Sequence, residues 1–253
     1  MNVGPDVSTA APPAYGLLGT IAWTALGIAL WFMAQVLILY GFAAWKELSE
    51  PGTVVSLSQL ATDGTALAIA VILAAPVWIG VVAYAARLRG WSARGYLALI
   101  PARRGEILFG IACLAPLLIA FDLLTLAFGR DVVPPFMRDS YLAAKGYGSL
   151  PLFFIAVVIV GPIAEEIAFR GFMFRGLSTT WLGVGGTLAV TSGIWAAMHI
   201  QYDLLVVGQI FVIGVVLGWL RWASDSTLLT TLLHMLANLG AILEAMILVE
   251  WSS

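Results

Sequence analysis

The sequence contains few charged residues. Asp, Glu, Lys and Arg make up 10% of its 253 residues, against about 25% in typical soluble domains. Hydrophobic residues make up 61%, and the mean hydropathy is +0.99. Such a chain cannot cover itself with water-facing side chains. This composition excludes an ordinary soluble domain and predicts that lipid is the solvent.

Cysteine and basic residues are also scarce. The single cysteine, Cys113, cannot form an internal disulfide and has no cysteine or histidine neighbour for a metal site. A net charge of -2 without a basic stripe excludes a nucleic-acid partner. Residues 1–15 hold no Lys or Arg, so they lack the basic region of a secretory signal. We expect 1–15 to be a flexible tail and 16–253 to form one membrane-embedded domain.

Long apolar runs dominate the rest of the chain. A helix needs about 20 apolar residues to cross about 30 Å of hydrocarbon. The runs are continuous rather than alternating, which disfavours strands. We therefore predict an all-α, polytopic transmembrane bundle of about seven spans, within a range of six to eight. The segments lie near 16–45, 65–86, 106–128, 150–177, 183–201, 204–221 and 227–249.

The distribution of Lys and Arg predicts the orientation of these spans. If the seven spans alternate, eight basic residues lie on one face and four on the other. Five of the eight lie between 87 and 104, and the others are Arg170, Arg175 and Arg221. This asymmetry places the N-terminus inside and the C-terminus outside the cytoplasm.

Two adjacent glutamates lie in the fourth predicted span, where ionisable residues are costly and usually functional. Glu166 and Arg170 are four residues apart on a helix, so they share a face and can pair. Glu165 points about 100° away. It is the less compensated carboxylate, a candidate general base. The alternative is that the whole cluster is a buried ion network that holds helices together.

Both histidines of the chain also lie in predicted spans. Trp195 and His199 are four residues apart, as are His234 and Asn238, so each pair shares a helix face. His234 and Asn238 could donate hydrogen bonds to one point, as an oxyanion requires. Equally, they could join neighbouring helices by hydrogen bonds. His199 could instead be a hydrogen-bonded core residue with Trp195 packed beside it.

These motifs, in this order, resemble the CPBP family, the CAAX-processing and bacteriocin-processing (Abi) intramembrane peptidases. The resemblance covers about residues 150–245, and Trp195 stands where the family often has Phe. It implies that Glu165 and His199 activate the attacking water and that Glu166 and Arg170 support the site. It also implies that His234 and Asn238 stabilise the oxyanion.

The chemistry leaves a metal as an alternative. Glu165, His199 and His234 form a two-His, one-Glu set of the kind that holds catalytic zinc. The general base would then have to come from elsewhere, and Glu166 is expected to pair with Arg170. We therefore favour a glutamate-activated water without a tightly bound cofactor. The depths of Glu165 and His234 in their spans predict a polar cavity open to the cytoplasm.

The leading hypothesis is an intramembrane endopeptidase, metalloprotease-like if it binds zinc, that acts on a membrane-associated protein or peptide. The resemblance implies the bilayer of a bacterial cytoplasmic membrane. Two alternatives remain open. One is a proton-coupled transporter with a path through Asp122, and the other is a non-catalytic immunity or binding protein on the same fold.

Overall fold

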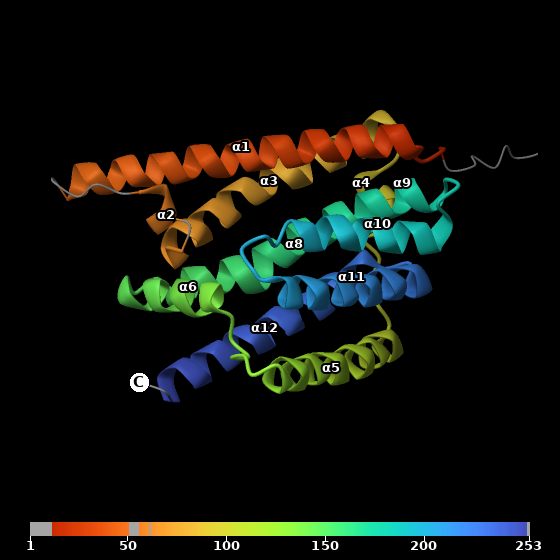
Figure 1. Cartoon of the computed structure of the whole chain (residues 1–253). Helices are drawn as coiled ribbons and strands as arrows, with labels where there is room; N and C mark the ends of the chain where they lie inside the picture. Colours follow the sequence, from red (N-terminus) through yellow and green to blue (C-terminus); the bar gives the residue numbers. More distant parts are fainter. Residues whose placement is uncertain (1–11, 51–55, 61, 252–253) are drawn as a thin grey trace, which may run out of the picture.

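The computed structural model describes residues 12–50, 56–60 and 62–251, and this part of the chain contains helices and no strand. Six of its helical segments are long and apolar enough to cross a membrane. They are α1 (Leu17–Ser49), α3 (Gly64–Leu88), α5 (Arg104–Ala127), the continuous segment Leu150–Ser178, α11 (Leu204–Ser224) and α12 (Thr227–Trp251). The expected polytopic helical bundle is therefore confirmed (Figure 1).

The predicted span 183–201 is wrong in length. The corresponding helix, α10 (Gly183–Ala197), has 15 residues, so it is about 22 Å long, shorter than the hydrocarbon core. It still reverses the chain direction, because it packs along α11 before the chain turns back. The start of α1 and the end of α12 therefore lie at opposite ends of the bundle (Figure 1).

Local capping defines where two of these helices begin. The Asp63 side chain accepts hydrogen bonds from the backbone N–H groups of Thr65 and Ala66, at the start of α3. Asp203 does the same for Leu205 and Val206, at the start of α11. Each carboxylate satisfies donors that a helix N-terminus leaves unpaired. The second cap also ends the turn 198–203, so His199 lies just beyond α10 instead of inside a span.

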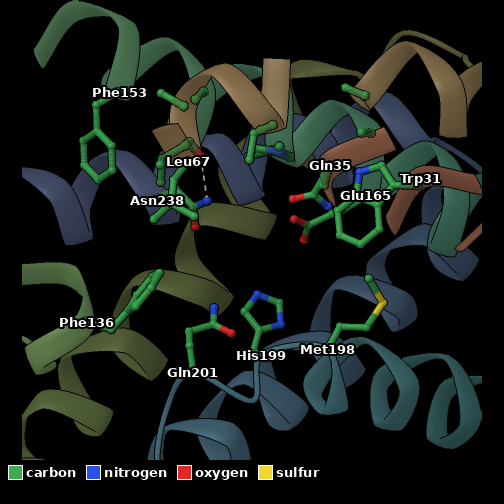
Figure 2. Close-up of a pocket in the computed structure, with 18 of the residues that line it drawn as sticks. Trp31, Gln35, Leu67, Phe136, Phe153, Glu165, Met198, His199, Gln201 and Asn238 are labelled. Atoms are coloured by element: carbon green, nitrogen blue, oxygen red, sulfur yellow. Dashed lines mark hydrogen bonds between the residues drawn. The ribbon is translucent and has the colours of Figure 1, made fainter. Parts of the chain in front are cut away.

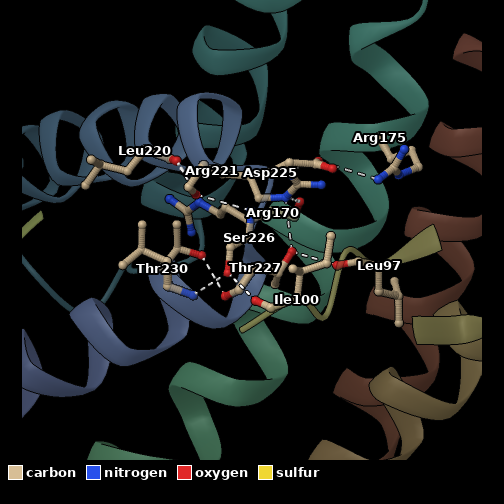
Figure 3. Close-up of polar contacts among 12 residues, drawn as sticks. Leu97, Ile100, Arg170, Arg175, Leu220, Arg221, Asp225, Ser226, Thr227 and Thr230 are labelled. Atoms are coloured by element: carbon tan, nitrogen blue, oxygen red, sulfur yellow. Dashed lines mark hydrogen bonds and ion pairs between the residues drawn. The ribbon is translucent and has the colours of Figure 1, made fainter. Parts of the chain in front are cut away.

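One end of the bundle is closed by the arginine-rich segment between α3 and α5. Its short helix α4 (Ala93–Tyr96) and the next two residues pack inward, with Tyr96, Leu97 and Ala98 at most 2% exposed. The Thr227 hydroxyl donates to the Leu97 carbonyl at 2.6 Å, and the Ser226 hydroxyl donates to the Ile100 carbonyl at 2.5 Å. The segment is thus fixed to the start of α12 (Figure 3).

Arg221 extends this network to the helix that carries the glutamates. Its buried guanidinium donates to the Arg170 carbonyl at 3.0 Å, to the Thr227 hydroxyl at 3.1 Å and to Asp225 at 2.7 Å. Asp225 occupies the left-handed region, with φ 49°, where α11 ends. Arg221 therefore stabilises the tight turn between α11 and α12 (Figure 3).

The other end of the bundle carries α2 (Leu57–Leu60) and α6 (Pro135–Gly146) (Figure 1). There, Lys145 pairs with Glu250 at 2.5 Å, and Arg130 pairs with Asp203 at 2.7 Å. Four basic residues lie at this end, and seven lie at the arginine-rich end. Arg170, counted there from the sequence, is instead buried inside the bundle.

The main core lies between α3, α11, α12 and the glutamate-bearing segment, and includes Trp78, Phe169, Leu217 and Leu233. Of the expected tail 1–15, residues 1–11 lie outside the described residues. Tyr15 is held in place, since its hydroxyl donates to the Ala85 carbonyl at 3.0 Å and its ring packs against Phe172.

We expect Gly64→Ala to destabilise the protein, because a Cβ at this position would lie 2.1 Å from the Ser140 carbonyl oxygen in α6. Overpacking of this kind costs about 1–3 kcal/mol. Gly80→Ala, in the same helix, is the matched control because a Cβ there meets nothing within 4 Å. Thermal unfolding in detergent should show a lower Tm for Gly64→Ala alone. Equal Tm values would contradict the close approach of α3 and α6.

Candidate active site

The two glutamates lie on a helical segment interrupted by two π-helical stretches. The segment runs through α7 (Leu150–Phe154), η1 (Ile155–Val160), α8 (Gly161–Glu166), η2 (Ile167–Met173) and α9 (Phe174–Ser178). π-helical turns are rare and occur frequently at functional sites. Here they flank α8, the short α-helical stretch that carries Glu165 and Glu166.

Glu166 belongs to a buried charge cluster. Its Oε1 atom lies 2.8 Å from Arg170 Nη1 and 3.0 Å from His234 Nδ1. Glu166 and Arg170 are at most 1% exposed, and Arg170 also donates to the Gly214 carbonyl at 3.1 Å. The predicted Glu166–Arg170 pair is therefore confirmed. His234 is an additional partner of Glu166, whereas the family resemblance assigned it only to the oxyanion site.

Glu165 has a different environment from its neighbour. It is partly exposed and lines a cavity, and its Oε2 atom accepts a hydrogen bond of 2.6 Å from the Trp195 indole N–H. The Arg170 guanidinium lies 4.6 Å from the centre of the Trp195 ring. Trp195 therefore connects the buried cluster to Glu165. From the sequence we predicted only that Trp195 packs beside His199, so this polar contact was not expected.

His199 lies in the turn after α10, on the cavity wall. Its Nδ1 atom is 2.8 Å from the Trp195 carbonyl oxygen, so this nitrogen carries the proton and Nε2 is the unprotonated nitrogen of the neutral ring. The Tyr202 ring stacks on the imidazole with a centroid distance of 6.3 Å and an interplanar angle of 16°. Both contacts fix the plane of the ring.

A cavity of about 440 Å³ brings these groups together. In Figure 2, Glu165 and Gln35 project from one wall, and His199 and Gln201 project from the facing wall. The rest of the lining is mainly apolar and includes Trp31 and Phe153. A few polar groups in an apolar cavity of this size are typical of a small-molecule or peptide site.

A second cavity of about 220 Å³ adjoins the first and shares several of its lining residues. Glu165, Trp195, His199 and Asn238 line both cavities. The second cavity adds His234, residues 132–134 before α6, and Glu244 of α12. The four sequence-predicted residues Glu165, His199, His234 and Asn238 therefore all line it.

Asn238 makes a contact that the proposed oxyanion role did not predict. Its Nδ2 atom donates to the Val157 carbonyl at 2.9 Å, shown as a dashed line in Figure 2. Val157 lies in η1, whose backbone offers such acceptors. One amide proton is used in this bond, and the second remains for another acceptor.

Both cavities reach the end of the bundle that carries α6. Their lining includes Leu67, one turn into α3, Phe136 of α6 and Val206, next to the start of α11. None of the residues that line them lies between 79 and 117. The lining thus lies toward the α6 end of the bundle. The opening to the cytoplasm, which we expected from the depths of Glu165 and His234, stays a prediction.

The alternative zinc set does not fit this geometry. The Trp195 ring packs in a T-shaped arrangement against both imidazoles, 5.3 Å from the centroid of each. His234 Nδ1 is already engaged with Glu166. Among the described residues, no group of three His, Cys, Asp or Glu side chains converges as metal ligands would.

Three further polar residues at the site were not assigned to it from the sequence. Gln35 of α1 lines the larger cavity with Glu165. Gln201 and Tyr202 line the same cavity. Their position directly after His199 was the available signal, because a polar turn between apolar runs needs water or protein partners.

Comparison with known proteins points in the same direction. Residues 147–240 match the family described as type II CAAX prenyl endopeptidase Rce1-like. This stretch of the chain is similar to that family. It contains Glu165, His199 and both partners of Glu166, which confirms the family resemblance.

A curated relative is the "Uncharacterized 24.3 kDa protein" of Escherichia coli, 34% identical over 110 residues. The match covers 41% of this chain and 48% of the relative, so the chain spans about half the length of that protein. No solved structure gives a significant match.

We expect Arg170→Met to lower the free energy of unfolding by about 3–5 kcal/mol, because it leaves the Glu166 charge buried without its guanidinium. Glu166→Gln alone leaves Arg170 similarly uncompensated. The double variant should lose clearly less than the sum of the two single losses. Chemical unfolding in detergent measures all three, and additive losses would contradict the coupling.

Proposed function

We propose that this protein is an intramembrane endopeptidase that hydrolyses a peptide bond with a glutamate-activated water. The observation that carries the proposal is the separation of the two glutamates. Glu166 is neutralised by Arg170, whereas Glu165 faces a cavity opposite His199. The family described as a prenyl endopeptidase supports a CAAX-type protease in general terms.

In this mechanism, Glu165 and His199 bind the attacking water between them. Glu165 accepts a proton from the water, and its orientation is fixed by the Trp195 N–H at Oε2. His199 Nε2 accepts the second hydrogen bond from the water, since Nδ1 is held by the Trp195 carbonyl. Glu165 then returns its proton to the leaving amine.

The oxyanion that forms on the substrate carbonyl needs fixed donors. We assign this role to the second amide proton of Asn238 and to the His234 imidazole, whose Nδ1 is bound by Glu166. Glu166 and Arg170 do not touch the substrate in this mechanism. They are positioning residues that hold His234 and the Trp195 ring.

The shape of the cavities indicates the type of substrate. The larger cavity is mainly apolar and is bounded by α1 and α3, so it suits an apolar side chain or a lipid chain attached to the peptide. The two cavities meet at Glu165 and His199, so a peptide could extend from one into the other across these groups. We propose a membrane-associated protein or peptide as the substrate.

A proton-coupled transporter receives less support from the geometry. It would require a polar path that continues to both faces, and residues of the 79–117 segment line neither cavity. A non-catalytic binding or immunity protein would use the same cavity without hydrolysis. The Glu165 substitution below separates it from a peptidase.

We expect Glu165→Gln to lower kcat for peptide cleavage by about 10²–10⁴-fold, because the amide cannot accept the proton from water. Asp139→Asn is the matched control, since Asp139 is an exposed carboxylate at the α6 end of the bundle. Cleavage can be followed by mass spectrometry of a membrane peptide library in liposomes. Unchanged cleavage by Glu165→Gln would contradict the catalytic assignment, and a wild-type phenotype in cells would favour the non-catalytic alternative.

We expect Trp195→Phe to lower kcat by about 10–150-fold with little change in KM, because a hydrogen bond to a charged group contributes about 1.5–3 kcal/mol. The aromatic packing against both histidines is retained by Phe. Trp181→Phe, at an exposed position in the turn before α10, is the control and should be neutral. A rise in KM alone would show that Trp195 acts on substrate binding instead of on Glu165.

A further inference from the structure

The helix α1 contributes one polar residue, Gln35, to the larger cavity. Trp31, Gln35 and Leu39 all line this cavity and follow one another at intervals of four, so they share one face of α1. The other residues between 31 and 39 are apolar. At 1.5 Å per residue, Gln35 lies about 27 Å from the start of α1 and about 21 Å from its end. At this depth, the cavity is the place where its amide can meet a polar ligand.

Trp31 fixes this face of α1 against the bundle. Its ring packs on Trp78 of α3, with a centroid distance of 4.9 Å and an interplanar angle of 60°. Gly27, one turn before Trp31, is buried beside the same indole, and a Cβ there would lie 3.7 Å from the indole nitrogen. Gln35, one turn after Trp31, is therefore held at the cavity wall by the packing of its neighbours.

The Gln35 amide makes no contact that would explain its position. In the part of the chain that the structure describes, no hydrogen bond engages its oxygen or its nitrogen. An amide without partners is costly in an apolar environment. Polar side chains in membrane spans commonly join helices by hydrogen bonds, and Gln35 does not do so. Its donors and its acceptor are therefore available to a ligand in the cavity.

Gln35 lies on the same wall of the cavity as the proposed base. In Figure 2, Gln35 and Glu165 project from this wall, and His199 projects from the facing wall. A primary amide has one acceptor oxygen and two N–H donors. It can accept from the N–H of a peptide residue and donate to the C=O of the same residue, as paired antiparallel strands do. An extended peptide that passes Glu165 would present both groups to Gln35.

We propose that Gln35 is a substrate-binding residue that holds the main chain of an extended peptide beside Glu165. This assignment rests on the proposed function, because Glu165 defines where the peptide is cut. The contact binds a peptide group instead of a side chain, so it requires a free N–H at one position and accepts different side chains there. Gln35 lies outside residues 147–240, the stretch that matches the family. Substrate binding would therefore also depend on α1.

Amide-to-ester substitution in a peptide tests this contact, because it removes one N–H donor and changes the shape of the peptide little. The probe is the peptide of the membrane peptide library that binds Glu165→Gln most tightly, made with a single ester at successive backbone positions. Each ester peptide is compared with the all-amide peptide on the wild-type protein, Gln35→Leu and Met33→Leu. Met33→Leu is the matched control, since Met33 is an exposed residue of α1 that lines neither cavity.

We expect an ester at one position to lower kcat/KM of the wild-type protein and of Met33→Leu about 2–12-fold, the effect of one neutral hydrogen bond. Gln35→Leu should weaken cleavage of the all-amide peptide at least as much and should no longer respond to that ester. Its Tm should not fall, because an apolar side chain replaces an unpartnered amide. An undiminished ester effect in Gln35→Leu, or no ester effect in the wild-type protein, would overturn the contact.

Binding measurements separate this proposal from the proposed function. The Kd of each fluorescently labelled peptide is measured by anisotropy with Glu165→Gln and with the double variant Glu165→Gln/Gln35→Leu in detergent. If Glu165→Gln cleaves like the wild-type protein, the catalytic assignment fails, and an ester-dependent Kd that Gln35→Leu abolishes still supports the contact. If Glu165→Gln is inactive and Kd responds neither to the ester nor to Gln35→Leu, the catalytic assignment stands and the contact fails.

Discussion

Glu166, Arg170 and His234 form a charged cluster that the bundle buries almost completely. A charge in such an environment is tolerated only when partners satisfy it, and losing one partner costs about 3–5 kcal/mol. The cluster joins the glutamate-bearing segment to α12 through His234 and to α11 through the Gly214 carbonyl. The positions of three helices therefore depend on one carboxylate. Arg221 reinforces the same helix through the Arg170 carbonyl.

The cluster also determines what Glu165 can do. Because Glu166 takes the guanidinium, the neighbouring carboxylate is left with a single neutral donor, the Trp195 indole. The Arg170 guanidinium lies over the ring of Trp195, the residue whose N–H group binds Glu165. The two adjacent glutamates thus have different partners because their side chains leave the helix in directions about 100° apart. This is the physical basis for assigning structure to Glu166 and reactivity to Glu165.

Much of the fold and part of the site followed from local sequence rules. Long apolar runs predicted six of the membrane spans, and the spacing of Glu166 and Arg170 predicted their pair. The length of α10 did not follow, because Asp203 ends the turn by capping α11, and an apolar run does not reveal where a cap acts. Contacts between distant helices, such as His234 with Glu166 and Asn238 with Val157, were also beyond local spacing.

The short α10 determines where His199 lies. A full span at 183–201 would have kept His199 inside a regular helix. Since α10 stops at Ala197, the turn 198–203 instead lies beside the Arg130–Asp203 pair and lines the cavity. Non-helical backbone at this position needs polar partners, and an open cavity provides them as water. The same turn thus positions His199 and lines the cavity in which the proposed hydrolysis would take place.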